Sequence, residues 1–134
     1  MSFLPEHDRD FFESKEIAFE EVTAAGAKGV ILPGFLIPEG LCSRDPQGLV
    51  PCARADILVM VPQGYSDTAL DSFYVSPWLF LPSGQEPQNC TGRHDFAGRT
   101  WQFWSRHQPG GSWRPGTDGF DTFVQLIREA IRAR

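Results

Sequence analysis

The apolar residues near the end of the chain recur at helical spacing. Phe120, Phe123, Val124, Ile127 and Ile131 follow one another at intervals of three, one, three and four residues. This spacing places all five side chains on one face of a helix. Acidic residues early in the segment and arginines late in it complement the helix dipole. The pattern therefore predicts an amphipathic C-terminal helix.

Four shorter apolar segments precede this helix and predict strands. They are residues 17–22, residues 29–37 with an interruption at Pro33-Gly34, residues 56–61, and residues 72–81 with an interruption at Pro77. Within residues 56–61, positions 57–61 form a continuous apolar run that ends at Pro62, which is typical of a buried strand. A short helix is expected over residues 8–14, where acidic residues lie close to Phe11 and Phe12.

Two polar segments, residues 39–55 and 83–99, contain several glycines and prolines and no periodic apolar pattern. We interpret each as a loop or an insertion. Strands in succession followed by a helix predict an α+β fold with a four-stranded antiparallel meander. At this length, residues 1–134 are expected to form a single domain.

Composition and charge narrow the possible partners. The formal net charge of −5 argues against nucleic-acid binding, which needs clustered lysine and arginine. No apolar run approaches the length of a membrane span, and the first residues lack the apolar core of a signal peptide. Three cysteines without a C-x-x-C pair do not suggest a disulfide framework. We therefore expect a cytoplasmic protein with neither a membrane nor a nucleic acid as partner.

Three landmarks, in this order, resemble the ubiquitin-conjugating enzymes. Pro62-Gln63-Gly64-Tyr65 is similar to the family's turn of proline, two residues and tyrosine, and residues 72–75 resemble the strand that follows. Trp113-Arg114-Pro115 resembles the family's Trp-Ser-Pro, which also precedes an amphipathic helix. Residues 70–77, 101–107 and 113–119 more closely resemble the prokaryotic branch known as family E. The resemblance implies a ubiquitin-conjugating-enzyme-like (UBC) fold and a role in ubiquitin-like conjugation.

The sequence departs from the parent family at the catalytic positions. That family keeps its nucleophilic cysteine eight residues before the tryptophan of Trp-Ser-Pro, and here Ser105 stands at that distance from Trp113. The family's His-Pro-Asn motif is also absent. His94 lies eleven residues before Ser105, but Asp95 and Phe96 follow it. The resemblance therefore makes Ser105 the candidate nucleophile.

A serine hydroxyl is a poor nucleophile unless a neighbouring base removes its proton. His107 would lie on the same side as Ser105 in an extended segment, and histidine has a suitable pKa range for a base. An oxyester on Ser105 would react more slowly with an amine than a thioester, but it would resist cellular thiols. The alternative is that Ser105 is an ordinary residue in a domain that no longer catalyses and only docks partners.

Other residues near Ser105 are further candidates for the site. Cys90 is the alternative nucleophile, because it is the only cysteine in the second half of the chain; an incidental thiol is the simpler interpretation. Trp104 and Arg106 flank Ser105 and are expected to contact the substrate or a partner. His94 is a further candidate contact, or else an ordinary loop residue.

A zinc site would need Cys42, Cys52, Cys90 and His94 together, but the spacing of the first two is far wider than in known zinc sites. No metal and no cofactor are expected, since ATP would be used by the activating enzyme. The predicted function is acceptance of a ubiquitin-like protein from an activating enzyme of the same operon and its transfer to a target lysine through an ester on Ser105. The alternative is a catalytically inactive UBC-fold module that scaffolds the activating enzyme and the ubiquitin-like protein.

Overall fold

The computed structural model describes residues 2–90, 92–106 and 112–133. The helices are α1 (Glu6–Ser14) and α2 (Phe120–Ala133). The strands are β1 (Glu20–Ala24), β2 (Ala27–Leu36), β3 (Cys42–Asp45), β4 (Gly48–Pro51), β5 (Arg54–Val61), β6 (Phe73–Ser76), β7 (Gly92–Phe96) and β8 (Arg99–Trp104). Within these described ranges, no helix is long and apolar enough to cross a membrane.

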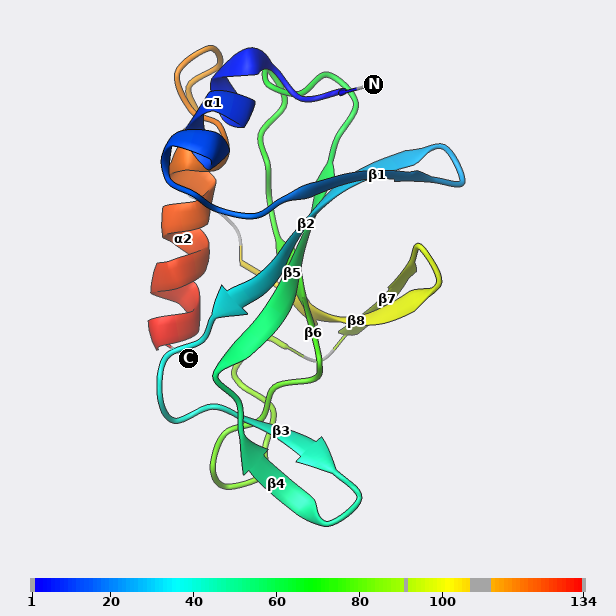
Figure 1. Cartoon of the computed structure of the whole chain (residues 1–134), viewed down its shortest axis with the longest axis vertical. Helices are drawn as coiled ribbons and strands as arrows, with labels where there is room; N and C mark the ends of the chain where they lie inside the picture. The colour runs from blue at the N-terminus through cyan, green and yellow to red at the C-terminus, as the bar shows by residue number, and fades with distance from the viewer. Residues whose placement is uncertain (1, 91, 107–111, 134) are drawn as a thin grey trace.

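Six strands form one sheet in the order β1-β2-β5-β6-β8-β7, and every neighbouring pair is antiparallel. Strands β3 and β4 form a separate hairpin. Both helices lie on one side of the curled sheet, and the turns of the β1–β2 and β7–β8 hairpins extend away from them (Figure 1). The arrangement is the expected α+β fold with an antiparallel sheet.

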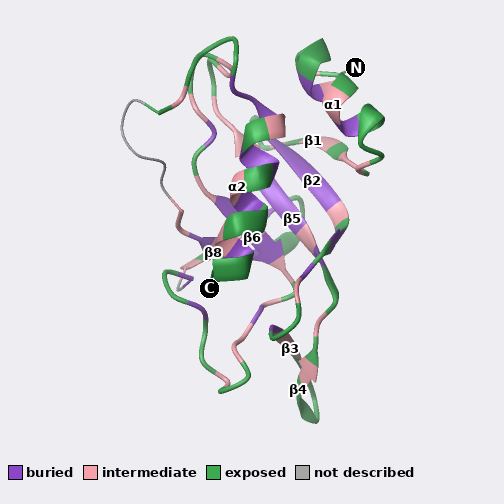
Figure 2. Cartoon of the chain, turned by 90° about the vertical axis from the view of Figure 1, so that its left-hand side faces the viewer, coloured by how far each residue is buried: buried purple, intermediate pink, exposed green. Residues whose placement is uncertain are grey.

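The main core lies between α2 and the sheet. The five apolar residues that predicted the helix are all buried, each with no more than 1% of its surface exposed. They join one apolar cluster with residues from β2, β5, β6 and β8, among them Val30, Ile57, Phe73 and Trp104. The opposite face of α2 is exposed, with the buried strands behind it (Figure 2). The predicted terminal helix is therefore confirmed, together with its buried face.

A second apolar cluster lies on the other face of the sheet and consists of Ile31, Leu58, Phe96 and Trp101. The sheet curls enough to bring Phe96 of β7 over Gly29 of β2. A Cβ atom on Gly29 would lie 2.9 Å from both Leu58 Cδ1 and Phe96 Cε2, which is closer than real contacts allow. Glycine at this position therefore permits the close approach of the Phe96 ring to the backbone of β2.

The prediction of a four-stranded meander was wrong in strand count, because six strands of the described residues form the sheet. Residues 39–55, expected to be a loop, contain the β3–β4 hairpin, and residues 83–99 contain β7 and the start of β8. Most residues of β3 and β4 are exposed. The inward side of β7 carries Gly92, His94 and Phe96, so it shows no apolar alternation. Strands that bury so little apolar surface leave little signal in the sequence.

The break predicted at Pro33-Gly34 is a local irregularity within β2. The pairing of β2 with β5 shifts register between Leu32 and Phe35, and β2 then continues to Leu36. The break predicted at Pro77 is where β6 ends, since that strand stops at Ser76.

The buried amide of Gln102 attaches the segment after β6 to β8. Its Nε2 donates a hydrogen bond to Leu79 O at 3.0 Å, and its Oε1 accepts one from Leu79 N at 3.0 Å. The same Oε1 accepts a hydrogen bond from Trp104 Nε1 at 3.1 Å. This side chain thus replaces a pair of strand hydrogen bonds and fixes the end of β8, where the candidate site begins.

Candidate functional site

Ser105 and Arg106 follow β8 directly and are held from two sides. Ser105 N donates a hydrogen bond to Asn89 O at 3.0 Å. Arg106 N donates a hydrogen bond to Ser72 Oγ at 3.2 Å, and Ser72 is the residue that precedes β6. Ser105 and Arg106 are both partly buried. The backbone around Ser105 is therefore fixed in place by segments distant in sequence.

The guanidinium of Arg106 brings a positive charge to this position. Its Cζ lies 5.0 Å from the centre of the Trp104 ring, and Nη1 donates a hydrogen bond to Ser105 O at 3.0 Å. Its Nη2 lies 4.0 Å from Cys90 Sγ. Arg106 therefore contacts the backbone carbonyl of Ser105 and the thiol of Cys90, and a cation so placed can stabilise negative charge that develops beside it.

Cys90 lies beside Ser105 but is completely buried. Its thiol donates a hydrogen bond to Gln88 O at 3.4 Å. Burial raises the pKa of Cys90 to about 11, although Arg106 acts in the opposite direction. Since the thiolate is the reactive form, only a very small fraction of this thiol is ionised at neutral pH.

A shallow groove of about 430 Å³ runs past this position toward the end of α2. One side of the groove is lined by Asn89 and Arg106. Asn89 is hydrogen-bonded to Ser105, and Arg106 follows Ser105 in the sequence. Ala130 and Ala133 are among the α2 residues on the other side. The small side chains of these two alanines leave the groove open beside the segment that carries Ser105.

Trp104 does not present a surface to a partner. Its side chain is completely buried, and its ring stacks on Phe73 with 5.5 Å between ring centres. The predicted contact of Trp104 with the substrate or a partner therefore gains no support from this burial and stays a prediction. Position next to Ser105 in the sequence gave no information on burial, whereas β8 directs this indole into the main core.

His94 lies away from Ser105. It lies on the edge strand β7 and pairs with Trp101 of β8. Trp101 is four residues before Ser105, a separation of about 13 Å along an extended strand. The centre of the His94 ring lies 4.8 Å from that of Tyr74, which packs against the second apolar cluster, on the face of the sheet opposite the helices. His94 Nε2 is buried and has no hydrogen-bond partner among the described residues. The structure therefore does not bring His94 to the site as a counterpart of the missing motif.

His107, the expected base, lies outside the described residues, and its role stays a prediction. Within residues 2–90, 92–106 and 112–133, no three side chains of histidine, cysteine, aspartate or glutamate are grouped so that they could hold a metal ion. The described chemistry near Ser105 is therefore that of Arg106, Cys90 and the neighbouring backbone.

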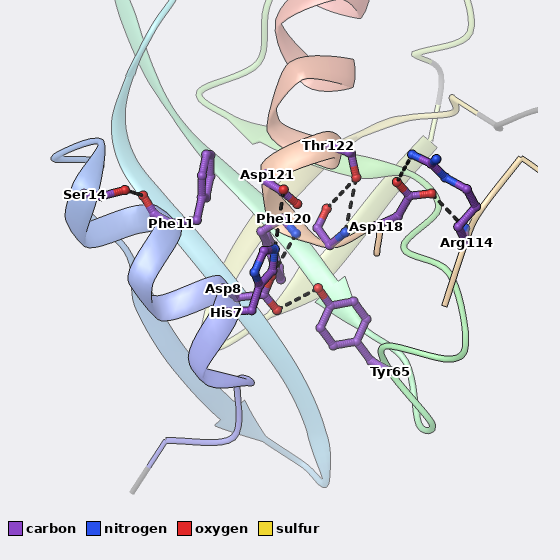
Figure 3. A network of polar contacts seen from close by, with 11 residues as sticks. His7, Asp8, Phe11, Ser14, Tyr65, Arg114, Asp118, Phe120, Asp121 and Thr122 are labelled. Carbon is purple, nitrogen blue, oxygen red and sulfur yellow. Dashed lines mark hydrogen bonds and ion pairs between the residues drawn. The ribbon is translucent and has the colours of Figure 1, made fainter. Parts of the chain in front are cut away.

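A buried carboxylate links both helices to the turn at Tyr65 (Figure 3). Asp8 is 1% exposed; its Oδ2 accepts a hydrogen bond from the Tyr65 hydroxyl at 2.7 Å. Its Oδ1 accepts one from Phe120 N at 3.0 Å, at the start of α2. A Cβ atom on Gly119 would lie only 2.6 Å from this oxygen. Sequence reasoning missed Asp8, although its spacing from Phe12 places it on the same, buried face of α1.

The segment between the site and α2 is also fastened to the Tyr65 turn. Trp113 Nε1 donates a hydrogen bond to Ser66 O at 2.9 Å, and the rings of Trp113 and Tyr65 lie 6.3 Å apart. Asp118 Oδ2 accepts a hydrogen bond from Arg114 N at 2.7 Å. The two sequence landmarks, the turn at residues 62–65 and the Trp113 segment, therefore meet in space.

Comparison with known proteins identifies the family. The family model described as Prokaryotic E2 family E matches residues 4–134. No curated protein and no solved structure matches the chain. An E2-like protein has a general role in conjugation, in which it interacts with an activating enzyme and a ubiquitin-like protein. With the family model covering nearly its whole length, the chain belongs to Prokaryotic E2 family E.

Proposed function

We propose that this protein accepts a ubiquitin-like protein from an activating enzyme of the same operon and transfers it to a target lysine through an ester on Ser105. The observation that carries the choice of Ser105 is the burial of the rival nucleophile, Cys90. Cys90, the nearest thiol, is completely buried and so closed to a large substrate, whereas Ser105 is only partly buried. Ser105 also stands at the family's nucleophile distance from Trp113.

The proposed reaction has two transfers. Ser105 Oγ attacks the thioester carbonyl that joins the ubiquitin-like C-terminus to a cysteine of the activating enzyme. The carbon–sulfur bond breaks, an oxyester forms, and the hydroxyl proton passes to the released thiolate. A lysine amine then attacks the oxyester, the carbon–oxygen bond breaks, and an amine proton returns to Ser105. His107 is the proposed carrier of the proton in both steps.

Arg106 has a proposed role as the stabilising cation. The parent family's asparagine, which would stabilise an oxyanion, has no counterpart in this sequence. The Arg106 guanidinium already hydrogen-bonds the Ser105 carbonyl, and a modest rotation of its side chain would direct an N–H toward an oxyanion on the substrate. On this proposal Arg106→Gln lowers the rate of adduct formation more than Arg106→Lys does, because lysine keeps the positive charge.

Intact mass spectrometry tests the proposal directly. The protein is incubated with its operon's activating enzyme, the ubiquitin-like protein and ATP. We expect an adduct that survives thiol reductant, is cleaved by hydroxylamine, and is lost in Ser105→Ala. Ser105→Cys is the informative variant, because its adduct should form and become sensitive to reductant. Cys90→Ala is the matched control and should retain the wild-type adduct.

Two results would reject the ester on Ser105. A wild-type adduct that reductant removes, and that Cys90→Ala abolishes, would assign the nucleophile to the buried thiol. Absence of any adduct, with the activating enzyme and the ubiquitin-like protein still bound, would instead support the catalytically inactive scaffold.

A further inference from the structure

Strand β2 extends beyond its neighbour β1. The pairing of β1 with β2 covers only residues 27–31 of β2. Beyond Ile31, β2 continues to Leu36 and pairs with β5 on its other side. The last part of β2 therefore has no strand paired with it, among the described residues, on the edge where β1 pairs with the first part.

At Leu36 this edge offers backbone hydrogen-bonding groups. Ile37 N donates to Ala53 O at 2.8 Å, which marks a hydrogen-bonded pair with the chain entering β5. Because hydrogen-bonded and non-hydrogen-bonded pairs alternate in an antiparallel ladder, the next pair, Leu36 with Arg54, turns the N–H and C=O of Leu36 away from β5. The Leu36 side chain is 66% exposed, the most exposed large apolar side chain of the described residues.

The neighbouring residues show that the edge is specific to Leu36. Gly34 N donates a hydrogen bond to Asp56 Oδ1 at 2.9 Å, and Gly34 O accepts one from Arg54 Nη1 at 2.9 Å. The backbone of Gly34 is therefore occupied. Uncovered strand groups such as those of Leu36 are a template for pairing with another chain.

A groove of about 630 Å³ lies along this edge, between β2, the segment before β1 and the end of α2. We call it the β2-edge groove. Its apolar lining includes Leu32, Phe35, Ile37 and Ile131, which are buried residues of the main core. In Figure 1 the end of β2 lies at the level of the C-terminal part of α2, and Arg128 and Ile131 of that part line the groove. The groove therefore combines an apolar floor with a strand edge.

The charged residues of the groove define what it would bind. Arg54, Arg128 and Arg132 line it together with Glu16 and Glu39, an excess of positive charge in a chain whose net charge is −5. The guanidinium of Arg128 lies 5.6 Å from the centre of the Phe35 ring, so the apolar floor supports this cation at the rim. An extended peptide with alternating apolar and acidic side chains matches both features, because a strand directs alternate side chains to opposite sides.

We propose that the β2-edge groove binds an extended acidic segment of a partner protein, which adds as a strand beside Leu36. Apolar side chains of the segment would contact the floor, and its carboxylates would face the arginines. The proposal does not depend on chemistry at Ser105, since it rests on β2, α2 and the segment before β1. This mode of recognition takes affinity from backbone hydrogen bonds and specificity from the side-chain pattern.

The test uses the full chain and two synthetic peptides with blocked termini, acetyl-Val-Glu-Val-Glu-Val-Glu-amide and its counterpart with lysine in place of glutamate. Binding is measured by isothermal titration calorimetry, and nitrogen–proton correlation spectra locate the affected amides. We expect the acidic peptide to bind at least about tenfold more tightly than the basic one, with changes concentrated around Leu36 and Arg128.

Two substitutions separate the strand edge from the charge. Leu36→Pro removes the outward N–H, which an edge position tolerates, and Leu36→Val is the control that keeps it. We expect Leu36→Pro to weaken the acidic peptide about tenfold relative to Leu36→Val at equal thermal stability. Arg128→Glu, at an exposed helix position, should also weaken this peptide and serves as the test if Leu36→Pro does not fold.

Three results would overturn the proposal. One is equal binding of the acidic and basic peptides, and another is an unchanged affinity in both Leu36→Pro and Arg128→Glu. The third is self-association, seen by sedimentation velocity, that Leu36→Pro abolishes, because a second copy of the chain would then occupy the groove.

Discussion

Replacement of Asp8 by alanine should destabilise the protein severely, because Asp8 connects α1 to two segments that lie far from it in the sequence. The buried carboxylate accepts hydrogen bonds from the Tyr65 hydroxyl and from Phe120 N, which belongs to the first turn of α2. Alanine would leave both donors without this acceptor. It would also remove a negative charge from the N-terminus of a helix, where such a charge is favourable.

The expected loss follows from these contacts. A hydrogen bond to a charged group contributes about 1.5–3 kcal/mol, so two such bonds represent about 3–6 kcal/mol. The cost of burying the carboxylate itself disappears in the variant and offsets part of this loss. We therefore expect Asp8→Ala to lower the free energy of unfolding by about 3 kcal/mol. Tyr65→Phe removes one of the two bonds while the carboxylate stays buried, and it should cost about 1.5–3 kcal/mol.

Urea denaturation followed by tryptophan fluorescence measures both effects. With a urea dependence of about 2 kcal/mol/M, Asp8→Ala should lower the transition midpoint by about 1.5 M. Asp10→Ala is the matched control, because Asp10 is an exposed acidic residue of the same helix and should have little effect. The double variant Asp8→Ala/Tyr65→Phe should be less destabilised than the sum of its parts. A loss below about 0.5 kcal/mol for Asp8→Ala, or strict additivity with Tyr65→Phe, would refute this account of the contact.

Two further predictions concern other buried or hydrogen-bonded groups. Gln102→Leu should lower the free energy of unfolding by about 2–4 kcal/mol in urea, because Leu79 and Trp104 lose their partners; a loss under about 1 kcal/mol would contradict this. Burial raises the pKa of Glu21, but hydrogen bonds from Ser2, Phe3 N and Leu4 N outweigh it, so the pKa is lowered from 4.5. Wild type should therefore be more stable than Glu21→Gln above pH 4.5, and this difference should disappear as the pH falls through the lowered pKa. Thermal melts at pH 7 and pH 2.5 measure the difference. An equal difference at the two pH values would contradict the role given to the Glu21 hydrogen bonds.

The sequence predicted α2 well because burial and periodicity coincide there. The same is true of β5, where Ile57, Leu58 and Val59 are all completely buried. By contrast, the β3–β4 hairpin is stabilised by backbone pairing between mostly exposed residues, and backbone pairing does not depend on an apolar pattern. Its position was therefore not predictable from hydrophobicity.

The candidate site was predicted only in part for a related reason. Ser105 and Arg106 follow from spacing within a family pattern, and such spacing does not specify burial. Trp104 and Cys90 were candidates by proximity and residue type, but the structure buries both completely. The environment of Cys90 depends on contacts with Gln88 and Arg106, and that of Asp8 depends on α2. Contacts between distant segments of this kind leave no local pattern.

The link between Asp8 and Phe120 has a consequence for synthesis of the protein on the ribosome. The two residues are 112 positions apart, so α1 leaves the exit tunnel long before its partner helix exists. Synthesis adds about 5–20 residues per second. For several seconds, therefore, the face of the nascent sheet that α2 later covers is exposed to water. Phe73 and Trp104 are on that side. The newly made chain therefore passes through a period of aggregation risk that ends only when α2 emerges, and chaperones that shield apolar surface should act during this interval.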